Sequence, residues 1–551
     1  MRTAAASLTL AATCLFELAS ALMPRAPLIP AMKAKVALPS GNATFEQYID
    51  HNNPGLGTFP QRYWYNPEFW AGPGSPVRIS CSVFGVRLVA SACGVSLTVW
   101  EKVVLFTPGE SDAADYDGFL TNKTIVGRFA EEIGGAVILL EHRYWGASSP
   151  YPELTTETLQ YLTLEQSIAD LVHFAKTVNL PFDENHSSNA DNAPWVMTGG
   201  SYSGALAAWT ASIAPGTFWA YHASSAPVQA IYDFWQYFVP VVEGMPKNCS
   251  KDLNRVVEYI DHVYESGDIE RQQEIKEMFG LGDLKHFDDF AAAITNGPWL
   301  WQDMNFVSGY SRFYKFCDAV ENVTPGAKSV PGPEGVGLEK ALQGYASWFN
   351  STYLPGSCAE YKYWTDKDAV DCYDSYETNS PIYTDKAVNN TSNKQWTWFL
   401  CNEPLFYWQD GAPKDESTIV SRIVSAEYWQ RQCHAYFPEV NGYTFGSANG
   451  KTAEDVNKWT KGWDLTNTTR LIWANGQFDP WRDASVSSKT RPGGPLQSTE
   501  QAPVHVIPGG FHCSDQWLVY GEANAGVQKV IDEEVAQIKA WVAEYPKYRK
   551  P

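Results

Sequence analysis

The sequence predicts an α/β fold, in which helices cover both faces of a parallel sheet and a large, mainly helical domain is inserted. The first observation is that short apolar runs alternate with helical patterns between about residues 103 and 222, which is typical of parallel sheets. The second is that this alternation stops near residue 229 and returns near residue 471. The third is composition: 44% of the 551 residues are hydrophobic and 19% are charged, so the chain can bury a large core.

The first strands and helix of the sheet domain follow in order from residue 103. Val103–Thr107 and Ala136–Leu140 are short apolar runs, which predict buried strands of a parallel sheet. Thr163–Gln166 has the pattern of a capping box, and apolar residues then recur at helical spacing as far as Val178. This pattern predicts an amphipathic helix.

The next elements surround a Gly/Ser-rich segment. A third apolar strand, Trp195–Thr198, leads directly into Gly199–Gly204. The small residues of Ala205–Ala214 predict a helix that Pro215-Gly216 ends, and Phe218–His222 predicts a fourth strand.

The rest of the chain divides into an insertion and a second part of the sheet domain. Helical patterns mixed with aromatic-rich, Cys-containing segments predict a helical cap over residues 229–459. Leu471–Ala474 and Val504–Ile507 predict two further strands, and Val527–Val542 predicts a last amphipathic helix. The predicted sheet domain therefore comprises residues 22–228 and 460–551.

The charge balance limits the partners. The chain has 62 Asp and Glu against 41 Lys and Arg, a formal net charge of −21. This is the wrong sign for a phosphate backbone or an anionic membrane surface, so we expect neither a nucleic acid nor a membrane as partner. An acidic surface also suits acidic surroundings, because many carboxylates can take up protons before the net charge becomes strongly positive.

The N-terminus has the features of a secretory signal peptide. Arg2 precedes an apolar run, and Ala19-Ser20-Ala21 offers small residues to a signal peptidase, so we expect residues 1–21 to be removed. Secretion is the preferred destination, with an acidic lysosome-like or vacuole-like compartment as the alternative. Nine glycosylation sequons fit this route: Asn42, Asn122, Asn185, Asn248, Asn322, Asn350, Asn389, Asn390 and Asn467.

Cysteine usage favours disulfides. Cys14 leaves with the signal peptide, and the remaining nine cysteines show no CxxC spacing of a zinc site, so we expect disulfides, no metal and no cofactor. The close pairs Cys358/Cys372 and Cys401/Cys433 are the expected bridges. The odd count leaves one free thiol, which we assign to Cys513.

Ser201 has the sequence context of a catalytic nucleophile. A serine hydroxyl needs a base to remove its proton, and a sharp turn from a strand to a helix presents it clear of the sheet. Gly199 and Gly200 precede Ser201, and Ser203 and Gly204 follow it. The usual GxSxG pattern has Gly where Ser203 stands, which is still a small side chain. An ordinary Gly/Ser turn is the alternative.

An acid and a histidine follow the serine in the order that such folds use. Asp479 comes after the strand Leu471–Ala474, and His512 comes after the strand Val504–Ile507. Three competitors are ranked lower because of their positions relative to the strands: Asp464, Asp483 and His505. His505 lies within a strand pattern and is interpreted as a core histidine.

Four segments together resemble the serine peptidases of family S28: Gly199–Gly204, Glu141–Gly146, Asp479–Trp481 and Gly510–His512. That family includes lysosomal Pro-X carboxypeptidase, dipeptidyl peptidase II and fungal acid prolyl endopeptidases. The resemblance covers most of the chain after Tyr48, and the turn at residues 107–110 looks closest to the fungal secreted branch. It implies an α/β-hydrolase fold with a helical cap inserted between the Ser and Asp segments, and cleavage after proline.

The resemblance also implies a triad of Ser201, His512 and Asp479. The oxyanion is expected to meet the backbone N–H of Tyr202 and a second N–H near Gly109 or Glu110.

Trp481 and Trp517 flank the acid and the base, and could form an aromatic wall for a proline ring or belong to the core. The predicted substrate is a proline-containing peptide, cut by an acid-active endopeptidase, with burial lowering the pKa of His512. The alternatives are an exopeptidase of the same family, a serine carboxypeptidase, lipase or esterase on this fold, and an inactive hydrolase-like binding protein. The serine carboxypeptidases usually carry Glu where Gly200 stands.

One segment does not fit the pattern. Residues 81–100 are mostly apolar, which a hydropathy scan could assign to a membrane span, but Arg87 would cost about 2.5 to 3.5 kcal/mol at the centre of a span. In the related family the chain passes almost directly from an Arg-Tyr-Trp segment, here Arg62–Trp64, to the strand at Val103. We therefore expect Arg78–Lys102 to be foreign to the fold, such as an intron retained in a gene model.

Overall fold

An eight-stranded sheet forms the centre of the computed structural model, in the order β1-β2-β6-β5-β7-β8-β11-β12. Counted in chain order among themselves, these strands run 1-2-4-3-5-6-7-8, which is the strand order of the α/β-hydrolase fold. Their bounds are β1 (Gly41–Tyr48), β2 (Thr58–Asn66), β5 (Val103–Phe106), β6 (Ala136–Leu140), β7 (Trp195–Gly200), β8 (Ala220–Ser224), β11 (Leu471–Gly476) and β12 (Val504–Ile507). The structure describes residues 40–72, 81–83, 86–88, 101–324 and 327–548, which belong to one compact unit.

The sheet differs from the predicted all-parallel arrangement at its N-terminal edge. β1 pairs with β2 and β2 pairs with β6 in antiparallel fashion, whereas the strands from β6 to β12 are parallel. Both strands were missed by the sequence analysis. Most of their residues are partly or fully exposed, so they lack the continuous apolar run that marks the inner strands.

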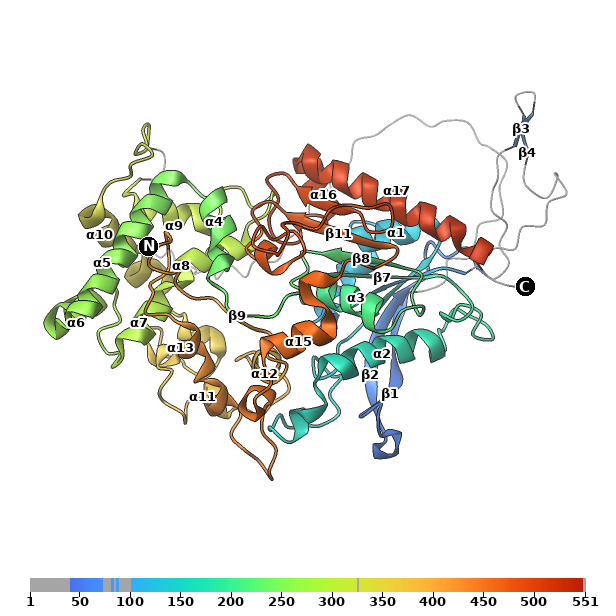
Figure 1. Ribbon diagram of the computed structural model, residues 1–551, viewed down its shortest axis with the longest axis horizontal. Coiled ribbons are helices and arrows are strands. Elements are labelled where there is room, and N and C mark those ends of the chain that lie inside the picture. The colour runs from blue at the N-terminus through green and yellow to red at the C-terminus, as the bar shows by residue number, and fades with distance from the viewer. Residues whose placement is uncertain (1–39, 73–80, 84–85, 89–100, 325–326, 549–551) are drawn as a thin grey trace, which may run out of the picture. The chain divides into compact units, whose positions relative to one another are not determined.

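Helices cover both faces of the sheet (Figure 1). α1 (Ile125–Ile133) and α17 (Ala525–Tyr548) pack with Val104 and Phe106 of β5. α2 (Leu164–Thr177) and α3 (Tyr202–Ile213) pack with Val103 and Leu105. Successive side chains of a strand point to opposite faces, so one apolar strand serves both layers.

The helix predicted after residue 163 begins as expected. Thr163 Oγ1 accepts the N–H of Gln166, which is half of the predicted capping box. The reciprocal half is missing, because the Gln166 side chain instead bonds the Asp50 carboxylate and the N–H of His51. The helix is thereby tied to the chain segment that follows β1.

Between β8 and β11 the chain is mainly helical, as predicted. A short parallel pair, β9 (Ile231–Asp233) and β10 (Phe406–Trp408), accompanies these helices. The helices are α4 (Phe238–Gly244), α5 (Lys247–Ser266), α6 (Ile269–Met278), α7 (Phe287–Ile294), α8 (Asn296–Trp299), α9 (Arg312–Val320), α10 (Leu338–Trp348), α11 (Pro381–Thr384), α12 (Lys394–Asn402), α13 (Ala426–Gln430), α14 (Cys433–Tyr436) and α15 (Ala453–Thr460). After β12, α16 (Leu518–Ala523) precedes α17.

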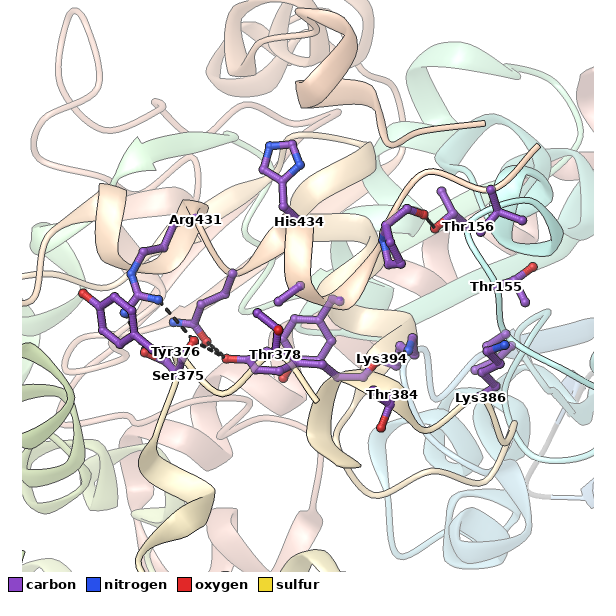
Figure 2. A pocket seen from close by; sticks show the side chains of 17 residues that line it. Thr155, Thr156, Ser375, Tyr376, Thr378, Thr384, Lys386, Lys394, Arg431 and His434 are labelled. Carbon is purple, nitrogen blue, oxygen red and sulfur yellow. Dashed lines mark hydrogen bonds between the residues drawn. The ribbon is translucent and has the colours of Figure 1, made fainter. Parts of the chain in front are cut away.

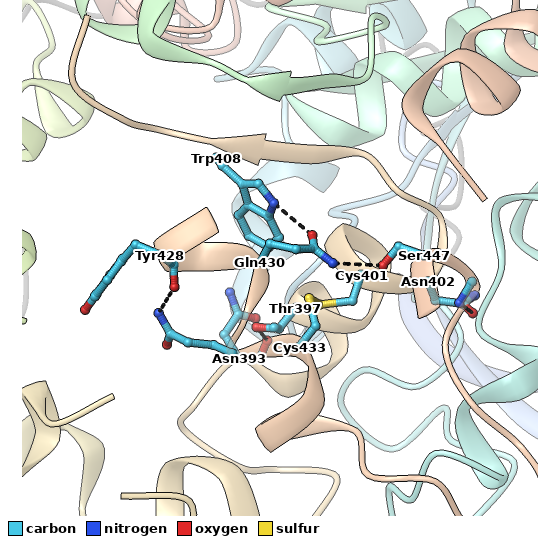
Figure 3. Close-up of a disulfide and its surroundings, with 11 residues drawn as sticks. Asn393, Thr397, Cys401, Asn402, Trp408, Tyr428, Gln430, Cys433 and Ser447 are labelled. Carbon is cyan, nitrogen blue, oxygen red and sulfur yellow. Dashed lines mark hydrogen bonds between the residues drawn. A yellow bond between two sulfur atoms is a disulfide. The ribbon is translucent and has the colours of Figure 1, made fainter. Parts of the chain in front are cut away.

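Three disulfides stabilise this helical region. The predicted bridges Cys358–Cys372 and Cys401–Cys433 are confirmed, and a third, Cys249–Cys317, joins α5 to α9. Figure 3 shows Cys401–Cys433 joining α12 to α14 beside the hydrogen bond from Trp408 to Gln430. Among the cysteines whose side chains the structure describes, Cys513 is the free one, as predicted.

Two predictions lie wholly or mostly outside the described residues: the signal peptide at 1–21 and the foreign segment at 78–102, which includes Cys93. Residues 81–83 and 86–88 form the short antiparallel pair β3 and β4. In the part of the chain that the structure describes, every helix is too short or too polar to cross a membrane.

The foreign segment was predicted to end at Lys102, which is too far toward the C-terminus. Glu101 is 7% exposed and accepts a hydrogen bond from Ser187 Oγ at 2.7 Å, and Lys102 O accepts the N–H of Ala136 at 2.9 Å. Both residues are therefore part of the fold.

Peptide mapping of the natural protein tests whether the segment before Glu101 is present. We expect no peptide from residues 78–100 and a peptide that joins Val77 directly to the Glu101 region. Abundant peptides from within the segment would contradict this expectation.

The nine sequons lie on accessible or partly accessible positions. Asn42, Asn122, Asn185, Asn322, Asn350, Asn389 and Asn467 are exposed. Asn248 and Asn390 are half-buried, and their side-chain amides donate to Glu321 and to Gln395. The seven exposed positions are therefore the better candidates for glycosylation.

Candidate active site

Ser201 lies in a strained turn between β7 and α3. Its φ of 58° and ψ of −131° belong to a region that residues with side chains rarely adopt. The turn is held by the Ser201 N–H, which donates to Ser224 O at 2.9 Å. A Cβ on Gly199 would lie 2.3 Å from Ser203 O, and one on Gly204 would lie 2.6 Å from Ser224 O. The small residues around Ser201 are thus required by close backbone approach.

His512 and Asp479 meet at the carboxyl ends of β12 and β11. His512 Nδ1 lies 2.9 Å from Asp479 Oδ1, which also accepts the N–H of Trp481 at 2.9 Å. Asp479 is completely buried. The two loops are held together by the Phe478 N–H, which donates to Gly510 O at 2.8 Å.

The three residues that rank below Asp479 and His512 in the sequence lie in other surroundings. Asp464 is exposed, and the buried Asp483 carboxylate accepts from Ser488 Oγ and the Lys489 N–H. His505 is half-buried and lies 3.4 Å from Glu533 Oε2 at the edge of the sheet, so it is not the fully buried core histidine that was expected.

Ser201 and His512 line one cavity of about 340 Å³. The other residues lining it are Phe106, Pro108, Glu110, Ser111, Tyr116, Phe119, Gly200, Ser203, Gln302, Cys513, Gln516, Trp517 and Tyr520. Of the two tryptophans predicted to bind substrate, Trp517 lines the cavity and Trp481 does not. Trp481 lies behind it, with its ring centre 6.5 Å from that of His512.

The cavity has an aromatic side. Phe106 and Phe119 are stacked with ring centres 4.5 Å apart, and Phe119 meets Trp517 edge to face at 5.1 Å. Tyr116 packs against both phenylalanines. Sequence reasoning missed all but Trp517, because nothing in residues 106–119 distinguishes aromatic side chains that line a cavity from those of the core.

Two glutamines of the cavity were also missed. Gln302 comes from the helical insertion, and its Oε1 accepts from Tyr237 Oη at 2.9 Å and from Trp481 Nε1 at 3.0 Å. Trp481 therefore positions Gln302. The side-chain amide of Gln516 is buried and has no hydrogen-bond partner among the described residues, which makes it available to a ligand in the cavity.

The expected oxyanion donors lie near Ser201. Tyr202 is the first residue of α3, where the N–H has no acceptor within the helix. Gly109 approaches α3 so closely that a Cβ would lie 2.5 Å from Ser203 Oγ, and its N–H already donates to Thr107 Oγ1 at 3.3 Å. Glu110 lines the cavity itself.

The electrostatics of the site differ from the prediction. Burial lowers the pKa of His512, but its electrostatic and hydrogen-bond interactions with Cys513 and Asp479 raise it, and the net result is a pKa well above the ordinary value. Burial acts in the expected direction, but the net pKa of His512 is raised and not lowered as predicted. Burial also raises the pKa of Glu110 to about 7, although its own N–H and the charge of His512 oppose the change.

The segment Glu141–Gly146, which carried part of the family resemblance, has a structural role. The buried Glu141 carboxylate pairs with Arg62 and accepts the N–H of Ala113 at 3.0 Å. Arg143 is fully buried and pairs with Asp170 at 2.5 Å. The Glu141 contact holds the loop after β5, which carries Gly109 and Glu110, whereas Arg143 ties the loop after β6 to α2.

A larger cavity of about 610 Å³ lies away from Ser201 (Figure 2). Figure 2 shows Thr155 and Thr156 on one side and Arg431 and His434 of the insertion on others. None of the predicted catalytic residues lines it. The smaller cavity, which holds both Ser201 and His512, is therefore the candidate active site.

A strained serine at the start of a helix, a histidine on its cavity and a buried aspartate bonded to that histidine, on an α/β-hydrolase sheet, define a serine hydrolase. The profile of the family described as serine carboxypeptidase S28 matches residues 99–292 and 347–530. The chain belongs to this family and is a serine-type peptidase.

Two fungal relatives are similar over nearly their whole length. The serine protease vicPa of Bipolaris victoriae is 40% identical over 521 residues, which cover 94% of this chain and 92% of that protein. The serine protease vicPb of the same organism is 38% identical over 525 residues, which cover 94% and 93%. A probable extracellular serine carboxypeptidase of Arthroderma benhamiae is 29% identical, covering 80% of this chain and 62% of that protein.

Solved structures give a weaker likeness. An esterase of Pyrobaculum calidifontis aligns with 91% of this chain and 85% of its own, with a TM-score of 0.32 and 12% identity. The α/β hydrolase GrgF of Penicillium aligns with 92% of this chain and 100% of its own, with a TM-score of 0.32 and 11% identity. Assignment of the fold therefore rests on the order and direction of the strands.

Proposed function

We propose that this protein hydrolyses peptide bonds on the carboxyl side of proline through an acyl-enzyme. Ser201 attacks the carbonyl carbon, while His512 takes the Ser201 proton and returns it to the leaving amine. Asp479 holds the His512 ring with its Nδ1 proton toward Oδ1 and stabilises the imidazolium. The Tyr202 N–H stabilises the oxyanion together with a second N–H, that of Gly109 or Glu110, from the loop after β5.

The observation that carries the proposal of proline specificity is the aromatic side of the cavity. Phe106, Tyr116, Phe119 and Trp517 offer an apolar surface next to Ser201, which suits a flat, apolar proline ring. The unpartnered amide of Gln516 is available to bond the peptide backbone of the substrate.

The charges of the cavity bear on whether internal bonds or chain ends are cut. Lys and Arg give the strongest hydrogen bonds to a terminal carboxylate, and the described residues that line this cavity include neither. We therefore propose an endopeptidase. Glu110 favours a second candidate, an X-Pro dipeptidyl peptidase, because its carboxylate could hold a free amine.

Three kinds of proline-containing peptide, with an alanine counterpart as control, test this choice. We expect an N-terminally blocked peptide to be cut after its internal proline, at least about tenfold faster than the same peptide with Ala in place of Pro. Glu110→Gln should leave that rate nearly unchanged. Cleavage only of free-amine X-Pro peptides, lost in Glu110→Gln, would support the dipeptidyl peptidase, and cleavage only of C-terminal Pro-X peptides would support a carboxypeptidase.

We expect activity to rise with pH, not to peak in acid. His512 must be neutral to act as a base, and its raised pKa keeps it protonated at acidic pH, so kcat/KM should fall about tenfold per pH unit below that pKa. Cys513→Ser removes an ionisable neighbour of His512 and should move this limb of the profile to lower pH. A maximum near pH 4, or a limb that Cys513→Ser leaves in place, would contradict the expectation.

We further propose that the protein is secreted and that residues 229–459 form its cap between hydrolase segments 22–228 and 460–551. The three disulfides suit an oxidising compartment, and one relative is named as extracellular. The cap contributes Gln302 to the catalytic cavity, so it takes part in substrate selection.

A further inference from the structure

A second group of reactive side chains is buried behind the proposed catalytic site. His222 on β8, Asp515 in the loop after His512, and Glu534 on α17 are 0%, 1% and 0% exposed. His222 Nε2 lies 3.1 Å from Asp515 Oδ2 and 3.4 Å from Glu534 Oε1. These atoms, which could each serve as a metal ligand, all lie within 4.8 Å of one another.

The facing atoms of this cluster lack hydrogen-bond partners. His222 Nε2, Asp515 Oδ2 and both carboxylate oxygens of Glu534 make no well-aligned hydrogen bond, and only the ion-pair contacts of 3.1 and 3.4 Å connect them. Buried polar groups are nearly always satisfied in folded proteins. Four unsatisfied atoms that converge from three segments therefore indicate a missing partner.

The outward-facing atoms of two members are satisfied. His222 Nδ1 lies 2.9 Å from Thr198 Oγ1, and Ser224 Oγ donates to Asp515 Oδ1 at 2.5 Å. The outer atoms of these two side chains are therefore hydrogen-bonded, whereas their inner atoms are not. Metal sites have the same arrangement, because the outer partners fix the tautomer of the histidine and orient the carboxylate.

We propose that His222, Asp515 and Glu534 bind one Zn²⁺ ion. In tetrahedral coordination, bonds of about 2.0 to 2.2 Å separate ligand atoms by about 3.3 to 3.6 Å, close to the two contacts of His222. A water molecule would supply the fourth donor, because the two oxygens of one carboxylate lie too close together to fill two tetrahedral positions. A neutral imidazole and two carboxylates carry a charge that a divalent ion cancels, and the imidazole nitrogen favours Zn²⁺ over Mg²⁺ or Ca²⁺.

The ion would have a structural role near the active site. It would join β8, α17 and the loop that follows His512, and the main-chain oxygen of Ser224 on β8 accepts the N–H of Ser201. The site is separate from the proposed catalytic cavity, so it can be tested by metal content, independently of peptidase activity.

The competing arrangement has a proton in place of the metal, with an imidazolium at His222 between the two acids. Metal analysis of the full-length secreted protein, folded in medium with zinc and dialysed without chelator, separates the two. We expect one zinc per chain, and at least about tenfold less in Glu534→Gln and His222→Gln. Asp532→Asn is the matched control, because Asp532 is exposed on the same helix, and it should retain the zinc.

Two measurements on the wild-type protein keep the test valid if those variants do not fold. Crystals should show an anomalous peak at the zinc edge within about 2.2 Å of the three inner ligand atoms. Protein refolded with a chelator should unfold at least about 2 °C lower, and zinc, but not magnesium, present during refolding should restore the midpoint. Metal-free protein, no anomalous peak and an unchanged midpoint would overturn the proposal.

Discussion

Ser201→Ala is expected to lower kcat by about 10⁵-fold to 10⁶-fold while leaving the fold intact. Removing the nucleophile of a serine peptidase costs about this much, and the residual rate comes from substrate binding and oxyanion stabilisation. The substitution removes one hydroxyl and keeps the Cβ. The side chain therefore places the same steric demand on the strained backbone of the turn. Steady-state kinetics on a proline-containing peptide measures the effect.

The fold of this variant is checked by thermal unfolding, whose midpoint should stay within a few degrees of the wild-type value. Activity within about tenfold of wild type in a properly folded Ser201→Ala protein would show that another residue is the nucleophile. Loss of both activity and folding would leave the labelling experiment described below as the decisive one.

Asp479→Asn is expected to lower kcat by about 10⁴-fold with little change in KM. An amide at this position cannot stabilise the imidazolium and favours the wrong tautomer of His512. The effect should exceed that of any ordinary surface substitution, because Asp479 Oδ1 contacts His512 Nδ1 directly, at 2.9 Å. Kinetics at a pH well above neutral avoids confusion with protonation of the histidine.

Asp464→Asn is the matched control for this prediction. In the sequence, Asp464 is an alternative to Asp479 as the acid of the triad. Its side chain is exposed, so the variant should retain wild-type kcat and KM within about twofold. A large loss in Asp464→Asn with little loss in Asp479→Asn would reverse the assignment of the acid.

The sequence predicts the parts of this structure that local patterns encode. The inner parallel strands are buried on both faces and appear as continuous apolar runs such as Ala136–Leu140. The strand, glycines and helix around Ser201 are contiguous, and the loops of Asp479 and His512 directly follow apolar strands. These features made the proposed triad residues predictable.

Features that depend on contacts between distant segments were not predictable. Gln302 enters the catalytic cavity from the insertion and is held by Tyr237 and Trp481. The partners of His222 come from far along the chain, so no spacing pattern marks them. The raised pKa of His512 depends on the distances to Asp479 and Cys513, whereas burial alone suggested the opposite direction.

Covalent labelling with an organophosphonate tests the central claim, that Ser201 is the nucleophile, most directly. The account predicts one adduct per chain, found by peptide mass spectrometry on the Ser201 hydroxyl and absent from Ser201→Ala. Labelling should become slower as the pH falls, because His512 becomes protonated. An adduct on another residue, or an undiminished adduct in Ser201→Ala, would contradict the account.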